Sequence, residues 1–160
     1  QPEIADAFTN LNIAVMECKG AVTPEFKRLI GYVTSFSSGC LYCQAHTILG
    51  AERFGSTKER LEQVWNYSDS SVFSNAEKAA LDFAFAAASV PNGVTEKEVS
   101  HLKSYWDAND IVEIMAVIAL FGFLNRWNDS MGSALEDLPI EKGEEYLKKS
   151  TNWVPGKHGV

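Results

Sequence analysis

The chain has little positive charge for its length. Its 160 residues carry 14 lysine and arginine side chains against 21 aspartate and glutamate side chains, which gives a formal net charge of −7. A surface that binds nucleic acid or an anionic membrane needs clustered positive charge, and the sequence contains no such cluster. We therefore exclude nucleic acid and membranes as partners and expect proteins or small molecules.

Cysteine is also scarce. Three cysteines are too few for the disulfide framework of a small secreted domain. Cys40 and Cys43 form a CxxC motif, which in a cytosolic protein indicates redox or metal chemistry. Cys18 stands alone, and we expect it to be a small buried side chain. No basic segment followed by an apolar one opens the chain, so we expect a cytoplasmic location.

The sequence contains no long uncharged apolar run. The most apolar stretch, residues 111–124, is too short to span a bilayer and contains Glu113. It predicts a helix buried on every face, either beneath other helices or in a subunit interface. Glycine-rich phosphate loops and nucleotide fingerprints are absent from the sequence, so we expect no cofactor besides a redox-active cysteine pair.

Apolar residues instead recur at steps of three and four, which predicts an all-α fold. Candidate N-caps start these segments: Thr23, Ser74, Thr95, and either Asp107 or Asn109. We expect one domain, with a helical core over residues 1–140 and a last helix and extended tail over residues 141–160. The expected helices cover residues 2–17, 24–36, 40–54, 58–64, 75–89, 96–106, 108–131 and 141–149.

One short segment brings together two thiols and an imidazole at helical spacing. A helix that starts at or just before Cys40 puts this thiol on the first turn, where free N–H groups and the helix dipole favour the thiolate. Cys40 and Cys43 lie three residues apart, as do Cys43 and His46, so each pair shares a helix face. A thiolate nucleophile, a second thiol and a nearby base indicate peroxide reduction or disulfide exchange.

The order of these motifs resembles a known family. Gly-Cys-x-Tyr-Cys-x-x-His, followed by a long apolar helix that ends Gly-Phe-Leu-Asn-Arg-Trp-Asn-Asp, is similar to the alkylhydroperoxidase-like (AhpD-like) proteins of the carboxymuconolactone decarboxylase superfamily. The similarity runs from about Phe8 to Pro139. It implies a compact bundle of about seven to eight helices that assembles into trimers or hexamers.

The resemblance also implies a chemistry. Cys43 would attack a hydroperoxide, Cys40 would resolve the resulting sulfenic acid as a disulfide, and His46 would belong to the proton relay. A small thiol or a thioredoxin-like protein would then reduce the disulfide.

Two positions depart from the family pattern. Characterised members place a glutamate twelve residues before the first cysteine, where it partners the histidine, and this chain has Arg28 there. Members also often place the histidine four residues after the second cysteine, where this chain has Thr47. Arg28, if it reaches the site, would favour a thiolate by its charge.

Other side chains are candidates to support the site. Glu113 and Glu52 are possible replacements for the missing carboxylate, although Glu52 lies out of helical phase with Cys43. Tyr42 between the cysteines is most simply a packing residue, and only secondarily a group that lines the site. Asn125 follows the apolar helix, either at an ordinary solvated helix end or as a buried hydrogen-bonding partner of a loop or a neighbouring subunit.

Alternative functions remain open from the sequence. A metal could bind Cys40, Cys43 and His46, with Cys18 or His101 as the fourth ligand. The protein could be a non-catalytic helical oligomer in which the cysteine pair senses redox state. It could also be a cofactor-free decarboxylase or lactone-processing enzyme.

Overall fold

The fold is entirely helical. The computed structural model describes residues 1–159, and within them the regular elements are nine α-helices and two 3₁₀ helices. The elements are α1 (Pro2–Met16), α2 (Pro24–Ser38), α3 (Leu41–Arg53), α4 (Lys58–Gln63), η1 (Val64–Asn66), α5 (Asn75–Ala88), α6 (Glu96–Lys103), α7 (Ala108–Met131), α8 (Asp137–Tyr146), α9 (Lys148–Thr151) and η2 (Gly156–His158). The predicted all-α fold is confirmed.

The predicted N-caps start the helices. Thr23 Oγ1 accepts a hydrogen bond of 3.1 Å from the backbone N–H of Phe26 at the start of α2. Ser74, Thr95 and Asp107 each form a reciprocal capping box with an acidic residue three positions later. Such caps depend only on local sequence, which explains why the sequence predicts these helix starts.

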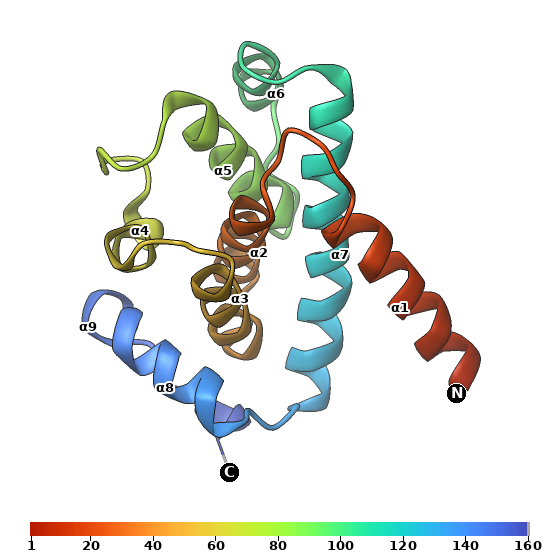
Figure 1. Ribbon diagram of the computed structural model, residues 1–160, viewed down its shortest axis with the longest axis vertical. Coiled ribbons are helices and arrows are strands. Elements are labelled where there is room, and N and C mark those ends of the chain that lie inside the picture. Colours follow the sequence, from red (N-terminus) through yellow and green to blue (C-terminus); the bar gives the residue numbers. More distant parts are fainter. Residues whose placement is uncertain (160) are drawn as a thin grey trace.

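Helix α2 lies at the centre of the bundle. It packs against α3, α5 and α7, and Figure 1 shows α2 and α3 side by side in the middle of the molecule. Leu29 and Ile30 of α2, Ile48 of α3 and Ile114 of α7 are fully buried. Burying each such side chain stabilises the fold by roughly 1.5–3 kcal/mol.

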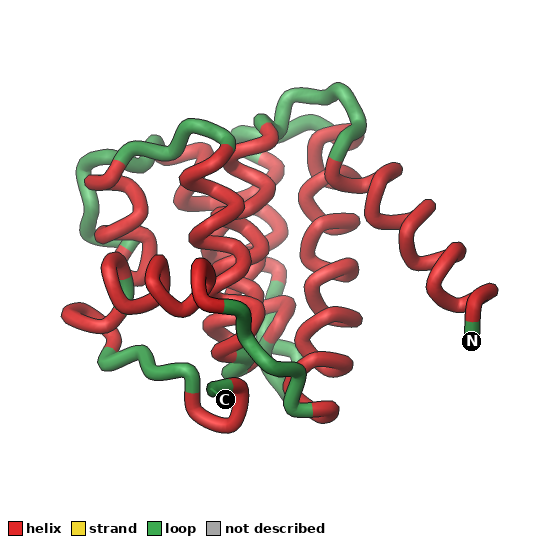
Figure 2. Tube along the Cα trace, turned by 60° about the horizontal axis from the view of Figure 1, so that its bottom comes forward, coloured by secondary structure: helices red, strands yellow, loops and turns green. Residues whose placement is uncertain are grey.

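Helix α7 is buried on one face only. By length and composition it could cross a membrane, but its inner face packs into the core. Its outer face exposes apolar side chains, among them Val112, Phe123, Trp127 and Met131. Of the two covers expected for α7, other helices of the chain supply one over its inner face only, and a subunit interface over its outer face stays a prediction. Helix α1 contacts α7 and projects from the bundle, as Figures 1 and 2 show.

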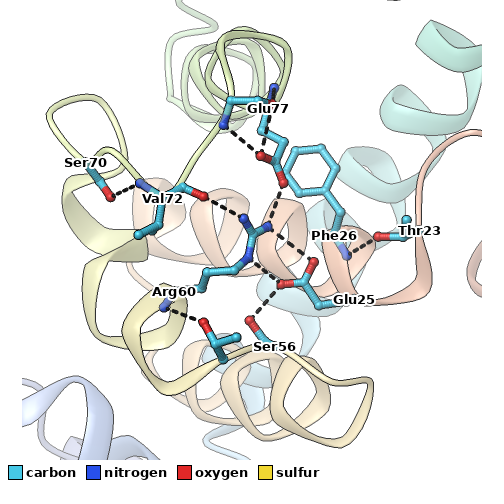
Figure 3. Close-up of polar contacts among 10 residues, drawn as sticks. Thr23, Glu25, Phe26, Ser56, Arg60, Ser70, Val72 and Glu77 are labelled. Atoms are coloured by element: carbon cyan, nitrogen blue, oxygen red, sulfur yellow. Dashed lines mark hydrogen bonds and ion pairs between the residues drawn. The ribbon is translucent and has the colours of Figure 1, made fainter.

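An arginine links α4 to α2 and α5. The Arg60 guanidinium lies between two carboxylates, 3.0 Å from Glu25 Oε1 and 2.6 Å from Glu77 Oε1 (Figure 3). It also donates a hydrogen bond of 2.9 Å to the carbonyl oxygen of Val72. All three partners are polar groups of other segments, so Arg60 holds the α4–α5 connection against the core.

A second ion pair is buried between α2 and α7. Lys27 is fully buried, and its Nζ lies 2.7 Å from Glu113 Oε1 and 3.1 Å from Cys18 Sγ. Lys27 also donates hydrogen bonds to the carbonyl oxygens of Val15 and Cys18. Cys18 itself is exposed, so the prediction that it is a buried side chain is wrong. Cys18 lies in a short, exposed turn after α1, and this turn covers the ion pair instead of entering the core.

The C-terminal helix begins earlier than predicted. Helix α8 starts at Asp137 rather than at Glu141, with Pro139 inside its first turn. Proline is tolerated there because the first N–H groups of a helix have no partner within the helix.

The last residues are folded onto the bundle. Trp153 is 2% exposed, and its Nε1 donates a hydrogen bond of 3.2 Å to the carbonyl oxygen of Leu41. Gly143 makes room for the indole, because a Cβ at this position would lie 2.6 Å from it. His158 is 1% exposed. The C-terminal segment therefore packs against the start of α3 instead of forming a loose tail.

Candidate active site

A cavity of about 630 Å³ lies among α1, α2, α3 and α7. Five of the predicted site residues line it: Arg28, Tyr42, Cys43, His46 and Thr47. A cavity of this volume holds a small organic molecule. The structure thus gathers most of the predicted site around one space that a substrate can enter.

The two cysteines occupy different depths at the start of α3. Gly39 ends α2 in the left-handed conformation, with φ 76°, and the chain turns directly into α3. Cys40 is the N-cap residue, and its Sγ accepts a hydrogen bond of 3.3 Å from the backbone N–H of Cys43. Cys40 is fully buried and does not line the cavity, whereas Cys43 does. Cys43 is therefore the thiol that meets a ligand in the cavity.

The pair of thiols favours one thiolate, on Cys40. A hydrogen bond from the Cys43 thiol lowers the pKa of Cys40, and the backbone N–H groups of Cys43 and Tyr42 act in the same direction. That same bond raises the pKa of Cys43, and burial adds to the rise. The negative charge of Asp129 opposes ionisation of both thiols. The hydrogen bond between the two thiols thus makes Cys40, rather than Cys43, the easier of the pair to ionise.

His46 is held by a carboxylate from a distant loop. Its Nε2 lies 3.0 Å from Glu136 Oε2, in the connection between α7 and α8. Burial lowers the pKa of His46, and the charge of Glu136 offsets part of that effect. A carboxylate acceptor fixes the proton on Nε2, so Nδ1 of the neutral ring is free to accept a proton. Nothing in the sequence pointed to Glu136, because the contact joins residues far apart in the chain.

Aromatic packing orients the imidazole. The ring centroid of Tyr42 lies 4.4 Å from that of His46 and 5.7 Å from that of His158. His158 is fixed in turn by a hydrogen bond of 2.8 Å between its Nδ1 and the carbonyl oxygen of Ser133. Tyr42 therefore lines the cavity, and the buried C-terminal segment supports it from behind.

Asn128 of α7 reaches the cavity thiol from the opposite wall. Its Nδ2 lies 3.7 Å from Cys43 Sγ, and this contact favours the Cys43 thiolate. The Asn128 side chain is oriented by Ser133, whose hydroxyl donates a hydrogen bond of 2.8 Å to Oδ1. The sequence placed Asn128 in the polar cluster after the apolar helix but did not assign it to the site. Helical spacing alone does not show which polar residue of α7 faces α3.

Thr47 and Arg28 line the cavity without a described contact to either thiol. The Thr47 hydroxyl lies 2.8 Å from the carbonyl oxygen of Cys43, so it hydrogen-bonds within its own helix. The Arg28 guanidinium stacks on the Phe54 ring, 3.8 Å from its centroid, and donates a hydrogen bond to the carbonyl oxygen of Pro24. Arg28 thus lies near the C-terminal end of α3, away from the cysteines.

Comparison with known proteins identifies the family. The model of the carboxymuconolactone decarboxylase family matches residues 2–86. The chain belongs to this family. A curated family relative is the uncharacterized protein YnjA of Escherichia coli (strain K12), which is 33% identical over 103 residues. That match covers 64% of this chain and 53% of YnjA, so the chain spans about half the length of this relative.

Solved structures of other proteins share the fold of this family member. The debrominase Bmp8 superposes with a TM-score of 0.87 and 33% identity, covering 91% of this chain and 77% of Bmp8. A Bmp8 variant with one cysteine changed to alanine has been crystallised with 2,3,4-tribromopyrrole. An alkylhydroperoxidase AhpD core protein from Ralstonia eutropha JMP134, an uncharacterized peroxidase-related protein, superposes with a TM-score of 0.77 and 26% identity, covering 87% and 74% of the two chains. The AhpD-like fold is confirmed.

Both carboxylates suggested as replacements for the family glutamate lie elsewhere. Glu113 is held by Lys27 and Cys18 and also accepts a hydrogen bond from the backbone N–H of Val22. Glu52 accepts a hydrogen bond from the Tyr146 hydroxyl and pairs with Lys142 at 3.0 Å. Neither residue lines the cavity, so in this family member the carboxylate beside the histidine is Glu136.

Asn125 does not reach the cysteine cavity either. It is 4% exposed and lines a separate cavity of about 530 Å³ on the other side of α7. Within the described residues its side-chain amide has no hydrogen-bond partner. The expectation that Asn125 is buried is met, whereas its place beside the redox pair is not.

A metal centre at the CxxC motif finds no support in the arrangement of donors. Within residues 1–159, no three His, Cys, Asp or Glu side chains are grouped so that they could share a metal ion. The suggested fourth ligands lie elsewhere, Cys18 beside Lys27 and His101 exposed on α6. The Cys40 sulfur instead accepts a hydrogen bond from the backbone N–H of Cys43, and Cys43 lines the cavity.

Proposed function

We propose that this protein is a thiol oxidoreductase that reduces hydroperoxides through Cys43 and Cys40. The observation that carries the proposal is the position of the two thiols. Cys43 lines a cavity large enough for an organic hydroperoxide, and Cys40 lies behind it at the helix N-terminus. The likeness to a debrominase and to a peroxidase-related protein supports an enzymatic role.

In the first step Cys43 attacks the peroxide. As the sulfur approaches the O–O bond, the Cys43 proton passes along the hydrogen bond to the Cys40 thiolate. A sulfur–oxygen bond forms while the O–O bond breaks, which leaves a sulfenic acid on Cys43 and an alkoxide. The alkoxide takes up a proton and leaves as the alcohol. Asn128, which favours negative charge on Cys43, stabilises the sulfur as it loses its proton.

In the second step Cys40 closes the disulfide. Cys40, which took the proton of Cys43, releases it to the alkoxide. The thiolate so restored, which the lowered pKa of Cys40 favours, attacks the sulfur of the Cys43 sulfenic acid. The sulfur–oxygen bond breaks, and the released hydroxide takes up a proton to form water. The sum is one hydroperoxide and two thiols converted to one alcohol, one water and one disulfide. An external dithiol, small or thioredoxin-like, restores the pair by disulfide exchange.

His46 is the proposed proton carrier for these steps. The imidazole lies on the same helix face as Cys43 and lines the same cavity. Its lowered pKa keeps it neutral near pH 7, so it can accept a proton through Nδ1. Glu136 would act as a positioning residue that fixes the ring and its tautomer.

The proposal is tested by the oxidation products of single variants. Reduced protein is mixed with cumene hydroperoxide, and the thiols are identified by mass spectrometry. The proposal expects a Cys40–Cys43 disulfide in the wild type and a trapped sulfenic acid on Cys43 in Cys40→Ser. A protein that oxidises no faster than a free small thiol would refute it and favour the non-catalytic redox-sensing oligomer. Turnover of a lactone or carboxylated substrate that survives Cys43→Ser would favour the decarboxylase alternative instead.

A second candidate is reductive dehalogenation. It is favoured by one observation, the similarity over 91% of the chain to the debrominase Bmp8. The same dithiol could reduce a carbon–bromine bond to a carbon–hydrogen bond, releasing bromide and a proton while Cys40 and Cys43 form a disulfide. Bromide release from a bromopyrrole by the reduced protein, absent in Cys43→Ser, would support this candidate over peroxide reduction.

Assembly and location form part of the proposal. The exposed apolar residues of α1 and α7 support a homo-oligomer, a trimer or hexamer as the family resemblance implies. A cytoplasmic location fits a protein whose working state is a reduced dithiol.

A further inference from the structure

Helix α3 lines the cavity along much of its length. Cys43, Gly50 and Arg53 all line the same space. At about 1.5 Å of rise per residue, the backbone positions of Cys43 and Arg53 are roughly 15 Å apart along the helix. The reactive thiol and the Arg53 side chain therefore mark two ends of an elongated cavity.

Two arginines, Arg28 and Arg53, line the cavity toward the C-terminal end of α3. Arg28 lies across α3 at Gly50, where an added Cβ would come within 3.0 Å of Arg28 Cγ, and stacks on Phe54. Arg53 follows on α3 itself, and its charge is one cause of the lowered pKa of His46. Within the described residues neither arginine forms an ion pair. Glu17 also lines the cavity, and its charge favours the charged form of Arg28 without pairing with it.

Apolar side chains form part of the walls between these two ends, beside the polar Asn12 and Thr47. Phe8 and Met16 of α1 face the cavity from one side, and Phe121 and Leu124 of α7 face it from another. The cavity thus combines a thiol at one end, partly apolar walls along its length and positive charge toward the C-terminal end of α3. A molecule that matches all three has an anionic head, an apolar chain and its reactive group several bonds from the head.

We propose that the cavity selects hydroperoxides of long-chain carboxylic acids. The carboxylate binds Arg53 and Arg28, the hydrocarbon chain lies along Phe121 and Leu124, and the O–O bond reaches Cys43. This substrate class rests on the proposed peroxide reduction at Cys43. The charge requirement is separate from that chemistry, because the arginines lie away from the thiols.

The test compares two substrates that differ only in charge. Reduced wild-type protein is mixed in a stopped-flow instrument with linoleic acid hydroperoxide or with its methyl ester, each below its aggregation concentration. We expect the acid to oxidise the cysteine pair about 10-fold faster than the ester, because a charge-assisted hydrogen bond is lost with the ester. Equal rates for acid and ester would overturn the proposal while leaving peroxide reduction intact.

Arginine variants test which side chains bind the carboxylate of the substrate. In Arg53→Gln and in Arg28→Gln, the ratio of the acid rate to the ester rate should fall several-fold toward one. The matched control is Arg126→Gln, an exposed arginine that lines the cavity on the other side of α7, and it should keep the wild-type ratio. A ratio that falls equally in all three variants would show a general effect of net charge and would contradict the proposed site.

A binding measurement separates failure of the site from failure of the chemistry. Dodecanoate has the head and the chain but no peroxide, and calorimetry should show that it binds wild-type protein more tightly than Arg53→Gln does. If no hydroperoxide oxidises the pair but dodecanoate binds in this way, the proposed function fails and the carboxylate site stands. If dodecanoate does not bind while hydroperoxides still react, the substrate class proposed here is wrong.

Discussion

His46 and Glu136 are 90 positions apart in the sequence, yet their side chains meet in a hydrogen bond of 3.0 Å. His46 lies on α3 at the cysteine cavity, and Glu136 is the residue before α8. The family glutamate expected twelve residues before Cys40 is replaced by Arg28, so the carboxylate beside the histidine comes from another part of the chain. The imidazole thus still has a carboxylate partner, but the glutamate that supplies it lies at a different place in the sequence.

Glu136→Gln should lower the pKa of His46 further. The charge of Glu136 raises that pKa against the effect of burial, so its removal leaves burial less opposed. We expect peroxide oxidation to slow by about 3- to 10-fold, since a misoriented base loses part of the usual gain from proton transfer. The pKa is measured by NMR titration of the imidazole, and the rate by stopped flow. Glu141→Gln, an exposed glutamate of the same helix, is the matched control and should change neither value.

Removing the Cys43 thiol should raise the pKa of Cys40. The hydrogen bond from Cys43 is the largest cause of the lowered pKa of Cys40, so Cys43→Ala shifts the ionisation of Cys40 toward higher pH. Cys43→Ser keeps a donor at this position and should shift it less. The ultraviolet absorbance of the thiolate, followed against pH, measures both. Identical titrations of the two variants would show that the thiol–thiol hydrogen bond does not set the Cys40 pKa.

Asn128→Ala should slow the reaction of Cys43. The Asn128 amide favours the Cys43 thiolate, so its loss raises the pKa of Cys43 and reduces oxidation by about 3- to 10-fold. Asn128→Asp should slow it more, because a carboxylate opposes a thiolate beside it. Asn109→Ala, an exposed asparagine in the first turn of the same helix, is the control. An oxidation rate for Asn128→Ala equal to that of Asn109→Ala would remove Asn128 from the site.

The parts of the fold that depend on local sequence were predictable. The Thr23 cap and the capping boxes at Ser74, Thr95 and Asp107 each involve residues within three positions of one another. The relation between Cys43 and His46 is also predictable from local sequence, because their spacing along one helix places them on one face. Both residues line one cavity.

The parts that depend on how helices face each other were not predictable from one sequence. Glu113 and Glu136 are both acidic residues far from the CxxC motif, and helical phase cannot show which of them approaches α3. The packing of the helices decides which glutamate approaches His46. Lys27 pairs with Glu113 in the core, and the turn after α7 brings Glu136 to His46. The burial of His158 follows equally from the fold of the C-terminal segment and not from its local pattern.

The buried ion pair between α2 and α7 should matter for stability. Lys27→Met leaves the Glu113 carboxylate buried without its partner and should lower the free energy of unfolding by about 3–5 kcal/mol. The double variant Lys27→Met/Glu113→Leu removes both charges and should recover much of the loss. Urea unfolding measures all three proteins. A double variant as unstable as Lys27→Met would show that packing, and not the unpaired charge, causes the loss.

The same pair predicts how stability changes in acid. Although burial opposes it, hydrogen bonds from Lys27 and Cys18 lower the pKa of Glu113. Glu113 therefore binds a proton more tightly in the unfolded chain than in the folded one. Its contribution to the stability of the fold is fully present above the ordinary carboxyl pKa. That contribution is lost as the pH falls through the pKa of Glu113 in the folded protein. Urea unfolding across this pH range should show that the free energy of unfolding falls less in acid for Lys27→Met/Glu113→Leu than for the wild type.

The most direct test of the account is to identify which sulfur an organic hydroperoxide oxidises first. Reduced Cys40→Ser protein is mixed with cumene hydroperoxide in the presence of a sulfenic acid trap, and the modified residue is located by mass spectrometry. The account predicts a trapped sulfenic acid on Cys43, because Cys43 lines the cavity. Slow oxidation of Cys43 in this variant, together with a fast sulfenic acid on Cys40 in Cys43→Ser, would contradict it.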